Sequence, residues 1–124
     1  MPRRSSRTAS STSHLFVLEM SLLDREVAAF NEGVRTGDWS SLVALFADDA
    51  VLEFVGIPVG PFLGRAAIGE AYRVQPPDDE IVVLEDRGDS AVYAWARDPE
   101  RRAGELHLEE RDGAIARLCI LYEQ

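Results

Sequence analysis

The chain has 124 residues, the size of one compact domain, and is 46% hydrophobic and 28% charged, as soluble globular proteins are. Its net charge of −9 argues against nucleic acid or an anionic membrane surface as a partner. The sequence holds no run of 18 apolar residues, so no membrane-spanning helix is predicted.

The cysteine and arginine content of the chain indicates its cellular compartment and the kind of genome that encodes it. Cys119 is the single cysteine, which excludes a disulfide within the chain and a cysteine-based metal site. One free thiol is typical of a reducing compartment, so we expect a cytoplasmic protein. The sequence carries no phosphate-binding glycine motif and no metal-ligand motif, and neither a cofactor nor a metal is predicted. All 13 basic residues are arginine, a bias that indicates a GC-rich, bacterial genome.

The N-terminal part divides into a leader and a first helix. Residues 1–19 are rich in Ser, Thr and Arg, a composition shared with transit peptides, and we interpret them as a disordered leader. The folded domain is predicted over 20–124. Its first helix should begin after Ser21, with Asp24 completing a capping-box-like start, and end at Gly37. One apolar face of this helix is predicted from Leu23, Val27, Phe30 and Val34.

A second, short helix should start after Asp38 and carry Trp39, Leu42, Leu45 and Phe46. Asp48 and Asp49 follow it, and a strand is predicted over 51–55. We interpret the two aspartates as structural, with side chains that accept backbone N–H groups where the chain turns into the strand. A metal site is disfavoured because no histidine or further acid lies nearby in the sequence.

The rest of the chain predicts one more helix and a β-meander. A Gly/Pro loop over 56–64 leads to a helix over 65–73. The strands are then expected over 81–84, 91–97, 105–111 and 114–122, the last two joined by an Asp-Gly hairpin turn. Helices first and strands afterwards indicate an α+β fold, with three N-terminal helices packed on one face of a curved antiparallel sheet.

Three segments carry a resemblance to a known superfamily. They are "FNEGVRTGDWSSLVALFADDAVLEF", "GRAAIGEAY" and "HLEERDGAIARLCILY". With this order of elements, residues 22–124 resemble the nuclear transport factor two-like superfamily, and within it the SnoaL-like polyketide cyclases and ketosteroid isomerases. The resemblance implies a cone-shaped sheet, a pocket between helices and sheet, and a homodimer formed through the sheet. It does not specify an activity, because this fold hosts enzymes and binding modules alike.

The resemblance also locates the positions of the isomerase groups, which are a carboxylate base and two oxyanion donors, a Tyr and a protonated Asp. The tyrosine position is Phe30. The base position is Phe54, or Ile57 if the following Pro-Val-Gly is aligned instead. The acid position is Leu106, or His107 if the hairpin glycines are matched, and we prefer Leu106 because strand alternation then turns apolar residues inward. None of the preferred positions carries the required group, so isomerase chemistry by this route is not predicted.

Glu53, His107 and Tyr72 remain as candidate catalytic residues. Glu53 is next to the expected base, but alternation along a strand turns it away from the pocket if Phe54 faces inward. His107 could act as an acid or base near neutral pH if it faced the cavity. Tyr72 matches a family tyrosine whose hydroxyl supports the catalytic tyrosine, so Phe30 leaves it free for water or a ligand. The alternative is a core tyrosine bonded to a backbone carbonyl.

Three hypotheses of function follow. The first is a module that binds a small apolar molecule, with a pocket formed by Phe30, Phe46, Phe54, Tyr72, Trp95 and Leu118. The second is a cofactor-independent isomerase or polyketide-cyclase-type enzyme that uses Glu53, His107 or Tyr72. The third is a dimeric scaffold whose cone is filled by side chains. Related epoxide hydrolases use an Asp-Arg-Asp group, and Arg97 could face inward, but the sequence places no aspartate beside it.

A homodimer is also predicted from the residues themselves. The meander strands carry apolar residues on both faces, for example Val82 and Leu84 on one side of a strand and Ile81 and Val83 on the other. One face can pack against the helices. The other would leave an apolar patch that a second copy can cover.

Overall fold

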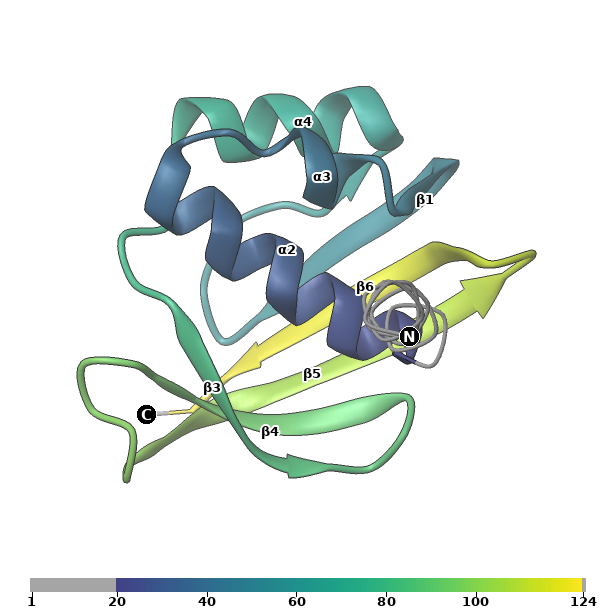
Figure 1. Cartoon of the computed structure of the whole chain (residues 1–124). Coiled ribbons are helices and arrows are strands. Elements are labelled where there is room, and N and C mark those ends of the chain that lie inside the picture. Colours follow the sequence, from purple (N-terminus) through teal and green to yellow (C-terminus); the bar gives the residue numbers. More distant parts are fainter. Residues whose placement is uncertain (1–19, 124) are drawn as a thin grey trace, which may run out of the picture.

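The structure is a computed structural model that describes residues 20–123. The elements of this part of the chain are α2 (Leu22–Thr36), α3 (Ser40–Val43), β1 (Phe46–Val55), β2 (Phe62–Leu63), α4 (Arg65–Val74), β3 (Ile81–Asp86), β4 (Ser90–Trp95), β5 (Arg102–Arg111) and β6 (Ala114–Tyr122). Figure 1 shows the helices gathered over one face of a curved sheet. The predicted α+β class is confirmed. The leader predicted over 1–19 lies outside the described residues.

The first helix, α2, has the ends that the sequence predicts. The Ser21 hydroxyl accepts a hydrogen bond from the Asp24 N–H at 3.0 Å, and Gly37 ends the helix with a left-handed φ of 79°. Its buried face, however, is formed by Leu22, Leu23, Glu26, Ala29, Phe30 and Gly33. Val27 and Val34 are partly buried and pack against the core at the edge of this face, as predicted, but the face also contains Glu26, so an acidic side chain enters the interior.

The sheet has six strands in the order β2-β1-β6-β5-β4-β3. Its pairs are antiparallel except for β1–β6, which is parallel. The sheet is therefore antiparallel, as predicted, at every pair but that one. Register shifts interrupt several pairs, at Val83/Glu85 between β3 and β4 and at Tyr93/Ala94 between β4 and β5. Irregularities of this kind bend strands, which accounts for the curvature.

Strand β1 starts earlier than the sequence predicted. Phe46 already pairs with Ile115 of β6, so it belongs to the sheet and not to the second helix. Asp48 and Asp49 consequently lie within β1 and are exposed, and both pair with arginines. Asp48 lies 3.0 Å from Arg65, and Asp49 contacts Arg111. The predicted backbone N–H partners are therefore wrong: both aspartates pair with arginine side chains instead.

The core lies between the helices and the inner face of the sheet. Its fully buried members come from every layer and include Leu42, Phe46, Ala50, Ile68, Ile115 and Leu118. This packing fixes α2 and α4 against the sheet, so the pocket described below has rigid walls. Among residues 20–123, no helix is both long enough and apolar enough to cross a membrane.

Candidate functional site

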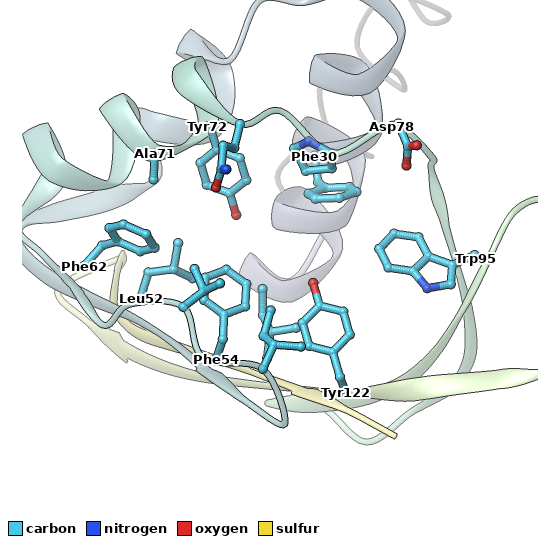
Figure 2. A pocket seen from close by; sticks show the side chains of 14 residues that line it. Phe30, Leu52, Phe54, Phe62, Ala71, Tyr72, Asp78, Trp95 and Tyr122 are labelled. Atoms are coloured by element: carbon cyan, nitrogen blue, oxygen red, sulfur yellow. The ribbon is translucent and has the colours of Figure 1, made fainter. Parts of the chain in front are cut away.

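A pocket of about 300 Å³ lies between the two long helices and the inner face of the sheet. Side chains of β1, β2, β4 and β6 line one side of it, and α2, α4 and the loop after α4 line the other (Figure 2). Most of these side chains are aromatic or aliphatic. The arrangement is typical of sites for small apolar ligands.

Four aromatic rings form the sheet side of the pocket. The Phe54 ring centroid lies 6.1 Å from that of Tyr122 in a stacked pair and 6.2 Å from that of Phe62 in an edge contact. Trp95 stacks on the other side of Tyr122 at 6.5 Å. Such contacts hold each ring in a preferred orientation, so the wall is preformed.

Of the six pocket residues that the sequence predicted, four line the pocket and two do not. Those that line the pocket are Phe30, Phe54, Tyr72 and Trp95. Phe46 and Leu118 do not line it, because both are completely buried in the core. Phe46 pairs with β6 at the start of β1, and Leu118 pairs with Leu52 beneath the pocket floor. Their aromatic or apolar character therefore serves packing.

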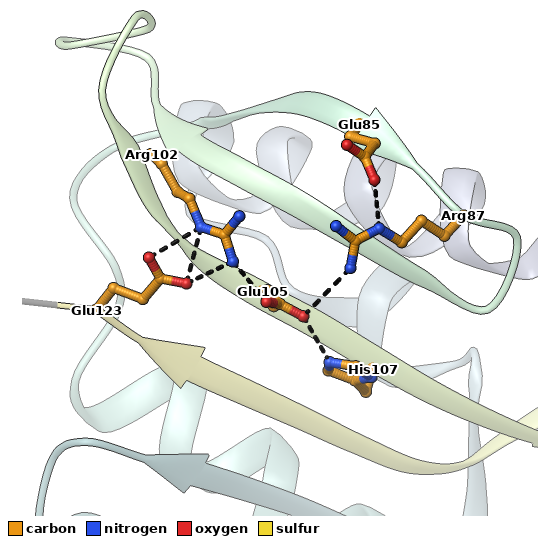
Figure 3. A network of polar contacts seen from close by, with 6 residues as sticks. All are labelled: Glu85, Arg87, Arg102, Glu105, His107 and Glu123. Atoms are coloured by element: carbon orange, nitrogen blue, oxygen red, sulfur yellow. Dashed lines mark hydrogen bonds and ion pairs between the residues drawn. The ribbon is translucent and has the colours of Figure 1, made fainter.

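Glu53 and His107 lie on the outer face of the sheet, away from the helices. Glu53 accepts a hydrogen bond from Arg117 Nε at 2.7 Å. His107 Nε2 lies 3.0 Å from a carboxylate oxygen of Glu105, in the polar network of Figure 3. Neither residue lines the pocket, so neither has the approach to Tyr72 that their proposed catalytic use requires.

Tyr72 projects from α4 into the pocket, and Figure 2 shows its hydroxyl pointing toward the interior. The ring stacks on Trp39 with centroids 5.0 Å apart and meets the edge of Phe30 at 6.5 Å. The hydroxyl is buried and has no hydrogen-bond partner within residues 20–123. Burial, with smaller effects from Glu26 and Tyr122, raises the pKa of Tyr72 well above its usual value. Tyr72 is therefore a neutral hydroxyl at physiological pH.

Glu26 is a site residue that the sequence analysis missed. Its side chain projects inward from α2 and is 1% exposed, and its Oε1 atom has no partner among the described residues. Burial raises the pKa of Glu26 from about 4.5 to about 8, so the carboxyl is protonated at neutral pH. The signal that could have found it is an acid at i+3 from Leu23 and i−4 from Phe30, which places it on the apolar face.

A smaller cavity of about 20 Å³ lies beside Glu26 at the inner end of the pocket. Tyr93 also lines it, and the Tyr93 hydroxyl is buried without a partner in the described part of the chain. The cavity shares four lining residues with the main pocket, namely Phe30, Trp95, Ile120 and Tyr122. A space of this size holds one water-sized group. The site therefore has a wide apolar chamber and a narrow polar end.

The mouth of the pocket carries an Asp-Arg-Asp group that the sequence did not predict. Arg97 donates from Nε to Asp79 at 2.9 Å and from Nη2 to Asp78 at 2.8 Å. The segment 75–80 folds back over the end of β4, where the Arg97 backbone N–H also donates to Asp79. Asp78 and Arg97 are exposed, so this group ties the loop to the strand at the rim. Within the described range, no set of three His, Cys, Asp or Glu side chains could hold a metal ion.

The comparison with protein families decides the identity of the fold. A family model described as the SnoaL-like domain matches residues 27–117. The chain belongs to the SnoaL-like domain family. The matched range includes most of α2, the pocket-lining strands β1 and β4, and all of α4 and β5. The resemblance seen in the sequence is thereby confirmed.

Solved structures share the fold of this SnoaL-like domain at low identity. A candidate ketosteroid isomerase from Kribbella flavida is 22% identical, with 81% of this chain and 77% of that chain covered and a TM-score of 0.56. A candidate polyketide cyclase from Pseudomonas putida is 18% identical, with coverages of 84% and 92% and a TM-score of 0.53. A computationally designed 17-OHP binder is 20% identical, with coverages of 84% and 92% and a TM-score of 0.57. No curated protein matches the chain.

The SnoaL-like domain has apolar side chains at the positions that the resemblance assigns to isomerase chemistry. Phe30, Phe54 and Ile57 all line the pocket. Leu106 is 3% exposed and faces inward, whereas its neighbour His107 is exposed. The inward position on β5 therefore belongs to Leu106, as the strand alternation indicated.

Proposed function

We propose that this SnoaL-like domain binds one small, mostly apolar molecule in the pocket between α2, α4 and the sheet. The observation that carries the proposal is an open chamber of about 300 Å³ with a preformed aromatic wall. Burial of an apolar ligand there is favourable at roughly 25 cal/mol per Å² of apolar surface removed from water. A computationally designed 17-OHP binder shares this fold, which is in keeping with the proposal.

Two alternatives receive less support. A scaffold with a filled cone receives less support because the pocket is an open chamber and because the Tyr72 hydroxyl in it is unpaired among the described residues. An isomerase or cyclase needs a proton-transfer group at the ligand, and Glu53 and His107 lie on the other face of the sheet. Glu26 is a buried acid beside the pocket whose pKa is raised to about 8, and with Tyr72, which lines the pocket, it is a residue through which an enzymatic function could act.

The binding proposal is tested by filling the chamber. Ala71 lines the pocket from α4, and Ala66 lies exposed on the same helix. We expect Ala71→Trp to abolish binding of any small molecule that copurifies with the wild-type protein, as detected by mass spectrometry after denaturation. Ala66→Trp should retain that molecule. If wild type and both variants carry no molecule and show no thermal shift with apolar compounds, the proposal is wrong.

A separate assay addresses ketosteroid isomerisation. We expect no turnover of a β,γ-unsaturated 3-ketosteroid above the buffer rate, because the assigned base and donor positions are occupied by Phe54, Phe30 and Leu106. Removing one oxyanion donor typically lowers kcat by about 100- to 1000-fold. The measurement is the absorbance of the conjugated product. Turnover that Glu26→Gln abolishes would favour the enzyme over the binding module.

A further inference from the structure

The inner end of the pocket is built from buried oxygen atoms that lack partners. Glu26 Oε1, Tyr72 Oη and Tyr93 Oη are each buried without a hydrogen bond within residues 20–123. Such atoms cost free energy unless something supplies the missing partner. Glu26 and Tyr93 line the inner cavity and Tyr72 lines the adjoining main pocket, so these oxygens on α2, β4 and α4 indicate a place for the polar part of a bound molecule.

The volume of the inner cavity limits that polar part. At about 20 Å³ it admits one water-sized group, and its four shared lining residues connect it to the main chamber. A ligand that reaches Glu26 must therefore have a small head and an apolar tail. A bulky or doubly charged head group does not fit.

The charges around the two cavities determine the sign of the head group. Among residues 20–123, no arginine or histidine lines either cavity, and no basic side chain pairs with Glu26, the acid at the inner end. An anionic head could accept hydrogen bonds from the buried hydroxyls, but it would have no cationic side chain beside it, and a buried charge without a counterion is unfavourable. The faces of Phe30, Trp95 and Tyr122 attract cations instead. The net charge of −9 favours the approach of cations as well.

We propose that the ligand is a primary alkyl amine, whose ammonium group enters the inner cavity and pairs with the Glu26 carboxylate. This inference rests on the proposed function of the pocket. An ammonium has three N–H donors. The unpartnered oxygens of Glu26 and Tyr93 lie at the inner cavity and that of Tyr72 lies in the adjoining chamber, so three acceptors are available to it. The tail lies in the aromatic chamber. A neutral head group fits the same volume, but only a cation gains from a side chain that can ionise.

Binding of this kind is coupled to a proton. The ammonium keeps its proton, while Glu26 changes from carboxylic acid to carboxylate and releases one proton to solvent. The other titratable groups that face Glu26 are Tyr72 from α4, Tyr93 from β4 and Tyr122 from β6. Burial raises the pKa of each above the usual tyrosine value, so none of them titrates between pH 6 and 8. Glu26 is therefore the source of the released proton.

The test compares three probes with one tail, n-octylamine, 1-octanol and octanoate, by isothermal titration calorimetry on the full chain. We expect octylamine to bind at least about tenfold more tightly than octanol at pH 7.5, and octanoate to bind most weakly. The amine affinity should rise by up to about tenfold per pH unit from pH 6 to 8. Titrations in buffers of different ionisation enthalpy should show close to one proton released per amine at pH 6.5 and none per octanol.

Glu26→Gln provides the matched variant, because it keeps the shape of the side chain and cannot ionise. It should lose the preference for the amine and the proton release, and it should bind octanol as the wild type does. If octanol binds as tightly as octylamine in the wild type, without proton release, the amine proposal is wrong while the binding function stands. If none of the three probes binds and no other apolar compound does, the proposed function itself fails.

Discussion

Glu26 makes the stability of the folded domain depend on pH. Its pKa is raised from about 4.5 to about 8 by burial, so the folded state holds its proton more tightly than the unfolded chain does. Below pH 4.5 both states are protonated and the group has no effect. Between pH 4.5 and 8 the unfolded chain loses the proton and the folded domain does not, so stability falls as pH rises.

The Glu26→Gln variant should therefore gain stability over the wild type as pH increases. Between pH 5 and pH 8 we expect the difference in unfolding free energy to shift by roughly 3 kcal/mol in favour of the variant. Urea denaturation of both proteins across this range measures it. The neighbouring tyrosines do not ionise there and are the same in both proteins. Parallel pH profiles would mean that Glu26 reaches solvent in the folded state.

Tyr72 gives a second test at the scale of one atom. Its hydroxyl is buried without a partner in the described part of the chain, so Tyr72→Phe removes a desolvated group and keeps the ring contacts with Trp39 and Phe30. We expect an unchanged or higher Tm, and a ligand with a polar head to bind less tightly by about 0.5–1.5 kcal/mol. Thermal unfolding and calorimetry measure the two effects. A Tm lowered by several degrees with unchanged binding would make Tyr72 a core residue only.

At the scale of elements, the packing of α2 depends on the absence of one side chain. Gly33 lies where α2 meets Trp39, and a Cβ there would stand 2.2 Å from the indole ring. The missing Cβ lets Trp39 pack between α2 and Tyr72, with its ring 5.9 Å from Phe30. This contact determines where the helix side of the pocket stands relative to the sheet.

We expect Gly33→Ala to destabilise the domain by about 1–3 kcal/mol, because a packed ring must move. Gly69 offers a matched control inside α4, since a Cβ there would meet Val43 at 3.5 Å, an ordinary contact. Gly69→Ala should be neutral or stabilising by up to about 1 kcal/mol, because alanine favours helix more than glycine does. Chemical denaturation of both variants measures the contrast. Equal effects would show that Trp39 adapts without cost.

The two elements that carry the site show how far the sequence could lead. The ends of α2 were predictable, because Ser21 and Gly37 act through local backbone geometry. The position of Glu26 on the apolar face could be read from its spacing to Leu23 and Phe30, but its burial and raised pKa could not, because they depend on neighbours from β4 and β6 that are distant in the chain. The early start of β1 likewise depends on Phe46 pairing with β6, a contact across some seventy residues. Local signals fix where elements begin and end, whereas pairing and burial need the assembled sheet.

At the scale of the whole molecule, the outer face of the sheet carries both paired charged side chains and exposed apolar side chains. Figure 3 shows a network across β3 to β6 in which Arg87 contacts Glu85 and Glu105, and Arg102 reaches Glu105 and Glu123. Beside it, on the edge strand β3, two large apolar side chains of the same face are exposed, Val82 and Leu84. The homodimer expected from the sequence stays a prediction. This edge offers apolar contact to a second copy.

The dimer prediction can be tested with a matched pair of variants. We expect the protein to be a homodimer by multi-angle light scattering at tens of micromolar, and Leu84→Glu to convert it to a monomer, because a buried unpaired charge at an interface costs several kcal/mol. Leu63 is also exposed but lies on β2, at the opposite edge of the sheet. Leu63→Glu should therefore leave the dimer intact. A wild-type monomer at this concentration would contradict the prediction, and dissociation by Leu63→Glu alone would move the interface to the β2 edge, next to the pocket that Phe62 lines.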